Sequence, residues 1–254
     1  MGMSPTAALA GFAIGILIGL TGMGGGSLMT PLLLWLGLPL PSAVGTDMII
    51  VAVTKLVAFW QHRRQKNIAW PLLRWLLIGG APAVLAGTLL LTRWGHQPEM
   101  KHFFVEILGI ALMAAALLST FSLLLPRLRQ APRRPHLPPL LWVVVGAAIG
   151  LVVGLTSIGA ATLLAPLLLL FSALLPRQMV GTDIAFSLAI SLLAGVLHLA
   201  AGTVEMPLVL NILLGSAAGV YMGSRLTLHV PQRSLRLLLA GVVFVVGAHW
   251  AMGS

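Results

Sequence analysis

Two aspartates are the residues of this sequence with the clearest potential for chemistry. They are the only aspartates in the chain, and each ends a Gly-Thr-Asp triplet, at residues 45–47 and 181–183. A carboxyl group inside an apolar helix can line a polar path and exchange a proton. Thr and Asp side chains can instead brace a helix start by capping its unpaired backbone N–H groups. Both roles stay open here for Thr46, Asp47, Thr182 and Asp183.

A glycine-rich stretch precedes each triplet. Residues 19–31 read GLTGMGGGSLMTP and residues 154–166 read GLTSIGAATLLAP. Each glycine weakens a helix by about 1 kcal/mol relative to alanine, so both stretches are expected to interrupt their helices. A helix that restarts after such a break presents unpaired N–H groups and a positive dipole end, which attract an anion. Close packing alone explains isolated membrane glycines, but not four within five residues.

The two breaks therefore supply most of the predicted substrate-binding residues. These residues are Thr21, Gly24, Gly25, Gly26, Ser27, Thr156, Ser157, Gly159, Ala160 and Thr162. Lys55 is added because an ammonium group about 13 residues into an apolar segment needs a partner or a water-filled cavity. Its alternative is to reach, or snorkel, towards the nearer end of the segment.

Histidines and metal-binding patterns contribute less. His62 and His198 occupy equivalent positions of a repeat, where they either relay protons or fasten a loop at the membrane interface. The other histidines lack metal-ligand spacing, and the chain has no cysteine. No metal, cofactor or disulfide is therefore predicted.

The composition specifies the elements that must position these residues. Of the 254 residues, 59% are hydrophobic and only 8% are charged, far below the roughly 25% charged residues of a soluble domain. Apolar runs of about 20 residues match the length of a membrane-spanning helix. We therefore predict an all-α transmembrane bundle in the lipid bilayer. Because short membrane loops account for the net charge of +10, no nucleic-acid partner is expected.

The chain also reads as a duplication. Glycines, threonines and prolines of the first half recur about 135 positions later, and a Pro- and Arg-rich linker lies between the halves. The predicted parts are an N-terminal transmembrane repeat at 1–127, a cytoplasmic linker at 128–138 and a C-terminal transmembrane repeat at 139–254.

The basic residues favour an inverted arrangement of these repeats. If each broken helix returns to the side that it entered, and three full spans follow, twelve basic residues share one face and Arg93 and Lys101 lie on the other. If each broken helix crosses fully, the split is 8 to 6. The positive-inside rule selects the first arrangement, with the basic face cytoplasmic. The twelve residues are Arg63, Arg64, Lys66, Arg74, Arg127, Arg129, Arg133, Arg134, Arg177, Arg225, Arg233 and Arg236.

The paired G-L-T-x-x-G-x-x-x-L-x-x-P and GTD motifs, the duplication and the length resemble the TauE/SafE family of membrane transporters, the sulfite exporter group. The resemblance spans both halves. It implies secondary transport of a small sulfur-containing or carboxylate anion, such as sulfite, sulfoacetate, thiosulfate or another organosulfonate, across the inner membrane. The second copy departs from the first at Ser157, Ala160 and Ala161, where the first has glycines. The two halves are thus expected to contact substrate unequally.

Three function classes follow from these residues. The leading one is a transporter in which inverted halves rock around an anion held between the breaks, with proton coupling through an aspartate or histidine. A passive anion channel uses the same features. An intramembrane aspartyl protease uses a carboxylate pair, but its further signature motifs are missing from this sequence. We therefore expect no enzyme, and the assembly, including a homodimer, stays open.

Overall fold

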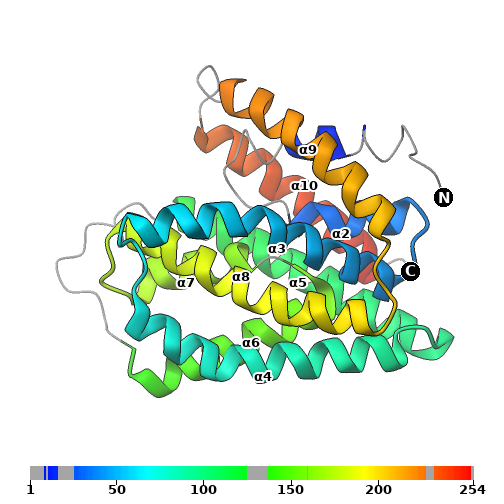
Figure 1. The fold of residues 1–254 in the computed structure, drawn as a ribbon, viewed down its shortest axis with the longest axis horizontal. Helices are drawn as coiled ribbons and strands as arrows, with labels where there is room; N and C mark the ends of the chain where they lie inside the picture. The colour runs from blue at the N-terminus through cyan, green and yellow to red at the C-terminus, as the bar shows by residue number, and fades with distance from the viewer. Residues whose placement is uncertain are drawn as a thin grey trace.

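The computed structural model describes residue 9 and residues 11–16, 26–124, 137–158, 160–226 and 232–252. These parts of the chain form helices and short turns, with no strand among them (Figure 1). The helices are α2 (Gly26–Trp35), α3 (Leu40–Arg64), α4 (Trp70–Trp94), α5 (Pro98–Leu124), α6 (Pro139–Thr156), α7 (Ala160–Phe171), α8 (Pro176–Ala200), α9 (Met206–Leu226) and α10 (Gln232–Met252). A short helical segment at residues 11–16 precedes them.

Six of the described helices are long and apolar enough to cross a membrane. They are α3, α4, α5, α6, α8 and α9, and their most apolar windows carry at most two charged residues. The prediction of a polytopic helical membrane protein is thereby confirmed.

Prolines set the starts of several helices. α3, α4, α6 and α8 each have proline in their first two positions, where the missing N–H has no partner to lose. Two glycines with positive φ mark turns, Gly37 after α2 and Gly202 after α8. Glycine adopts this backbone conformation without steric cost.

The helices α6 and α7 form the broken helix predicted for the second half. α6 ends at Thr156, α7 begins at Ala160, and α7 returns to the end of the bundle where α6 started (Figure 1). Three long helices, α8, α9 and α10, then run alternately along the bundle. In the first half, α3, α4 and α5 do the same, while the corresponding break at Gly22–Gly25 lies outside the described residues.

The two halves are interleaved. α4 of the first half packs closely along α6 of the second half, α3 along α8, and α5 along α10. At the first of these contacts, a Cβ atom on Gly79 would collide with the carbonyl oxygen of Val143, and one on Gly146 with that of Leu76. The predicted repeats at 1–127 and 139–254 therefore share one core, and the linker at 128–138 lies almost wholly outside the described residues.

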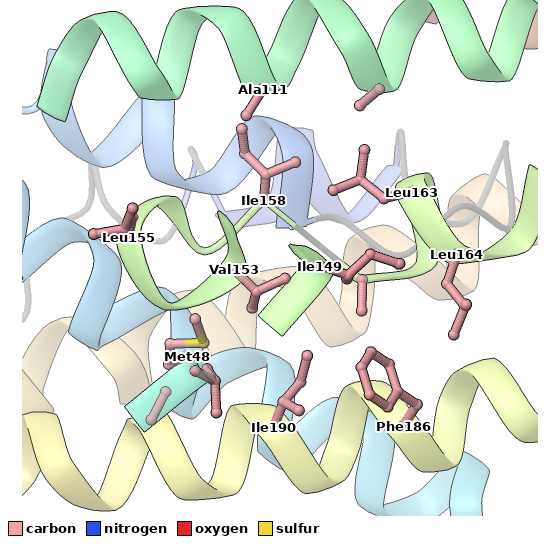
Figure 2. Close-up of a cluster of buried hydrophobic side chains, with 14 of the residues drawn as sticks. Met48, Ala111, Ile149, Val153, Leu155, Ile158, Leu163, Leu164, Phe186 and Ile190 are labelled. Atoms are coloured by element: carbon pink, nitrogen blue, oxygen red, sulfur yellow. The ribbon is translucent and has the colours of Figure 1, made fainter. Parts of the chain in front are cut away.

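The α6–α7 break is buried inside this shared core. Ile158, in the break itself, is fully buried and points towards Ala111 of α5 (Figure 2). On the other side, Val153 of α6 lies above Met48 of α3 and Ile190 of α8. The break is thus held between helices of both halves and is not lipid-facing.

Candidate functional site

Asp47 joins three separate parts of the fold. Its side chain on α3 is fully buried, and its Oδ2 atom accepts hydrogen bonds from Thr30 of α2 and from Ser157 in the α6–α7 break, each at 2.8 Å. Its other oxygen, Oδ1, is buried without a partner among the described residues. Because a bare carboxylate is very costly in an apolar medium, these two hydroxyl groups stabilise Asp47, and the bond from Ser157 also ties the two halves together.

Ser157 adopts a backbone conformation that disfavours serine. Its φ of 57° and ψ of 4° lie in the left-handed region, which costs a non-glycine residue about 1 kcal/mol. The equivalent position in the first half is Gly22, which has no such penalty. Serine at this strained position supplies the hydroxyl group that binds Asp47.

Thr156, beside it, is also engaged within the protein. Its hydroxyl donates to the carbonyl of Val152 at 2.6 Å and accepts a bond from the N–H of Ile158 at 3.2 Å. Thr156 and Ser157 were predicted to contact substrate directly. In this structure their hydroxyl groups serve the break and Asp47 instead.

The two GTD threonines make reciprocal bonds between the halves. Thr46 accepts a hydrogen bond from the N–H of Glu205 at 3.1 Å, and Thr182 accepts one from the N–H of Ala69 at 2.9 Å. Ala69 and Glu205 are themselves 136 positions apart, the same spacing as Thr46 and Thr182. Each threonine therefore braces a loop of the opposite half.

The motif does not cap its own helix. Its threonines instead accept bonds from N–H groups at the starts of other helices, those of Ala69 at the N-cap of α4 and Glu205 directly before α9, as the helix-bracing alternative describes. The N-cap positions are Pro39 for α3 and Leu175 for α8, several residues before each triplet. Thr46, Asp47, Thr182 and Asp183 lie inside the helices and are all buried.

The two triplets lie at opposite depths of the bundle. α3 and α8 run antiparallel, because Gly45 contacts His198 while Ile49, further along α3, contacts Gly195, earlier in α8. Asp47 therefore lies level with residues 196–197 of α8, about 13 residues from Asp183. At 1.5 Å per residue the two aspartates are roughly 20 Å apart along the helix axes.

Asp183 has different surroundings from Asp47. Its Oδ1 atom is buried without a hydrogen-bond partner among the described residues. The positions equivalent to the two donors of Asp47 are Gly22 and Ala165, which carry no hydroxyl group. Lys55 on α3 lies near the depth of Asp183 in the α3–α8 pair, without a direct ion pair between these two residues. The duplicated motif has thus become chemically unequal.

Histidine 198 lies against the first GTD triplet. It is fully buried, and a Cβ atom on Gly45 would lie 2.8 Å from its Nδ1 atom. Nδ1 also lies 2.7 Å from the hydroxyl oxygen of Thr203. Since Thr203 follows α8, this contact fastens the α8–α9 turn, which agrees with the loop-fastening alternative. The equivalent His62 is half-buried at the end of α3, and its Nδ1 atom lacks a partner among the described residues.

The remaining predicted site residues fall into two groups. Thr21, Gly24, Gly25 and Gly159 lie outside the described residues, whereas Gly26 and Ser27 begin α2. Ala160 and Thr162 are buried in the first turn of α7. Sequence reasoning missed Thr30 and Ser187, a buried serine on α8 whose hydroxyl lacks a partner among the described residues. No cluster of potential metal ligands occurs within the described residues.

Comparison with known proteins agrees with this architecture. The family model described as sulfite exporter TauE/SafE matches residues 7–250. The chain belongs to this family. A probable membrane transporter protein of Bacillus subtilis, YjnA, is 37% identical over 252 residues, which cover 96% of this chain and 98% of the relative. A second from the same organism, YdhB, is 26% identical and covers 93% of this chain and 94% of the relative.

Similar proteins also occur in archaea. The probable membrane transporter MJ0441 of Methanocaldococcus jannaschii is 25% identical over 262 residues, which cover 96% of this chain and 93% of the relative. No solved structure matches the chain. Membership of the TauE/SafE family identifies the protein as a membrane transporter.

The positions of the aspartates argue against the protease alternative for this TauE/SafE protein. A catalytic aspartate pair shares one proton between carboxyl groups about 3 Å apart. Asp47 and Asp183 are separated by roughly 20 Å along the α3–α8 pair. They cannot act as such a pair in this arrangement.

Proposed function

We propose that this protein is a secondary transporter that moves a small sulfur-containing or carboxylate anion across the inner membrane by alternating access. The anion class includes sulfite, thiosulfate, sulfoacetate and other organosulfonates. The main support is the buried contact between Asp47 of the first half and Ser157 in the break of the second half. Ionisable residues inside membrane spans mark substrate or ion pathways, and the sites of such transporters lie where the two halves meet.

The opposite directions of α3 and α8, which carry equivalent motifs, support inverted repeats and alternating access. α3 and α8 carry equivalent motifs and run in opposite directions, and the bonds of Thr46 and Thr182 are exchanged between the halves. Two halves related in this way can rock against each other, so that a central site opens alternately to each side. We place the basic ends, including Arg63 and Arg225, on the cytoplasmic side.

We assign proton coupling to Asp183 and bracing to the threonines. The Oδ1 atom of Asp183, which has no hydrogen-bond partner among the described residues, can hold a proton. Asp47 already receives two hydrogen bonds, which suits a group that holds the halves together.

Counterflow in reconstituted vesicles tests the transport class. Vesicles loaded with sulfite, thiosulfate, sulfoacetate, sulfate or lactate are given the same labelled anion outside. A carrier shows saturable uptake that is accelerated by internal anion, whereas a channel shows flux that is not saturated and cannot be driven uphill. Absence of counterflow for the whole panel would refute the proposal.

Two sets of variants test the assigned residues. Gly25→Val or Gly159→Val is expected to abolish counterflow while the protein still inserts and purifies. Retained transport would show that the helix breaks are not part of the transport site. Asp183→Asn is expected to keep exchange but to lose acceleration by a pH gradient. An unchanged response to the gradient would remove Asp183 from proton coupling.

A further inference from the structure

The middle of the α3–α8 pair carries polar side chains that are not part of the two Gly-Thr-Asp triplets. Lys55 lies level with residues 188–189 of α8, by the register that places Gly45 beside His198 and Ile49 beside Gly195. Its repeat equivalent, Ser191, is only two or three residues away, or roughly 4 Å along the axis. Lys55 and Ser191 therefore lie close to the depth at which equivalent residues of the two repeats are level with each other. This depth is between those of Asp47 and Asp183.

The polar residues of α8 form a line leading to this point. Asp183, Ser187 and Ser191 are spaced four residues apart, so they share one face of the helix. All three are at least nine-tenths buried. The hydroxyl of Ser187 and the Oδ1 atom of Asp183 have no hydrogen-bond partner among the described residues. Such unpaired groups are costly in an apolar interior, unless a ligand or water satisfies them.

Lys55 is distinctive among the basic side chains of the described helices. The other lysines and arginines in these helices lie within five residues of a helix end. Lys55 is 15 residues into α3 and half-buried, and by the same register it lies only five to six residues from the depth of Asp183. An ammonium group at this depth needs an anionic partner, and Lys55 forms no direct ion pair with any residue that the structure describes, so its hydrogen bonds are available to a ligand.

We infer that Lys55, Ser187 and Ser191 form the oxyanion-binding site, at a depth between the two Gly-Thr-Asp triplets. This inference rests on the transporter function proposed above. The ammonium group of Lys55 supplies the positive charge, and the two serine hydroxyls donate hydrogen bonds to oxygen atoms of a sulfonate, sulfite or carboxylate group. The bound anion competes with Asp183 for Lys55. The Gly-Thr-Asp triplets that end at Asp47 and Asp183 then close the transport path on either side of the site.

Calorimetric binding of sulfite, thiosulfate and sulfoacetate to the purified full chain in detergent tests this site. Lys55→Met is expected to weaken binding of the anion that binds wild type by at least tenfold, and Ser187→Ala by about fivefold. Thr92→Val is the matched control, because the Thr92 hydroxyl bonds only carbonyls of its own helix near the end of α4. Its binding is expected to stay within about twofold of wild type.

An exchange across the repeats tests the central position. In the double variant Lys55→Ser and Ser191→Lys, the ammonium group moves to the equivalent position of the other half. The double variant is expected to bind at least about threefold more tightly than Lys55→Ser alone, because the site lies where the repeats meet. No recovery in a double variant that folds like wild type would overturn the central placement.

A protection experiment covers variants that fold poorly. The chain has no cysteine, so Ser187→Cys introduces a unique thiol, with Thr92→Cys as its control. Saturating sulfoacetate or thiosulfate is expected to slow alkylation at position 187 and leave position 92 unaffected. Equal rates at position 187 with and without an anion that binds would overturn the site. If the wild type binds none of the anions, the transporter proposal itself fails, which is a distinguishable result.

Discussion

Ser157 offers the sharpest test of how the two halves are held together. Two effects oppose each other at this residue. Its left-handed backbone costs about 1 kcal/mol, and its hydrogen bond to Asp47 is worth about 1.5 to 3 kcal/mol because the acceptor is a carboxyl group. Ser157→Gly removes both, whereas Ser157→Ala removes only the hydrogen bond.

The two variants should therefore differ by the backbone term alone. We expect Ser157→Ala to destabilise the protein by about 2 kcal/mol and Ser157→Gly by about 1 kcal/mol. For a chain of this length, 1 kcal/mol corresponds to a shift in Tm of about 2–4 °C. Thermal unfolding in detergent, followed by tryptophan fluorescence at one heating rate, measures the Tm of the wild type and of both variants. The Tm values are expected to decrease in the order wild type, Ser157→Gly, Ser157→Ala.

A double-mutant cycle then isolates the contact. If Ser157 acts through the charged carboxyl group of Asp47, Ser157→Ala should cost less in an Asp47→Asn background, because an amide oxygen accepts a weaker hydrogen bond than a carboxylate; the expected coupling energy is about 1 kcal/mol. Thr162→Ser provides a nearby conservative control in α7. Additive effects of Ser157→Ala and Asp47→Asn, or equal stability of the alanine and glycine variants, would refute the reasoning.

Further expectations follow from other contacts. Thr46→Val should speed amide hydrogen exchange at Glu205, and Thr182→Val should speed it at Ala69, because each threonine is the acceptor for that N–H; the reverse pattern would contradict the reciprocal bonds. Gly45→Ala should lower Tm by several degrees because the new methyl group would press on His198, whereas Gly241→Ala, with nothing within 4 Å, should leave Tm unchanged. Single cysteines that replace Arg63 and Arg225 should react with an impermeant thiol reagent from the same side of the membrane, and one that replaces Glu205 should react from the other side. Labelling of positions 63 and 225 from opposite sides would exclude the topology.

Patterns within one segment predicted much of the fold. The apolar runs gave the long helices, and the glycine-poor second copy still predicted the break between Thr156 and Ala160. These features depend on local backbone energetics and on the length needed to cross a membrane, which a sequence records directly.

Contacts between distant segments were not predictable in the same way. Nothing near Ser157 indicates that its hydroxyl reaches Asp47, 110 residues earlier. A comparison of the two copies does contain a signal, since Thr30 and Ser157 replace residues without hydroxyl groups, Ala165 and Gly22. The opposite depths of the two triplets depend on the antiparallel register of α3 and α8, which only the packing of Gly45 and Gly195 fixes.

The interleaving of the halves has a consequence for biosynthesis. While the first half emerges from the ribosome, α4 has no α6 to cover its glycine face, and the N–H of Ala69 has no Thr182 to accept its bond. The helices α3, α4 and α5 must therefore remain incompletely packed in the membrane until α6 and α8 have been synthesised. Packing of the bundle is then completed only when the second half has been made.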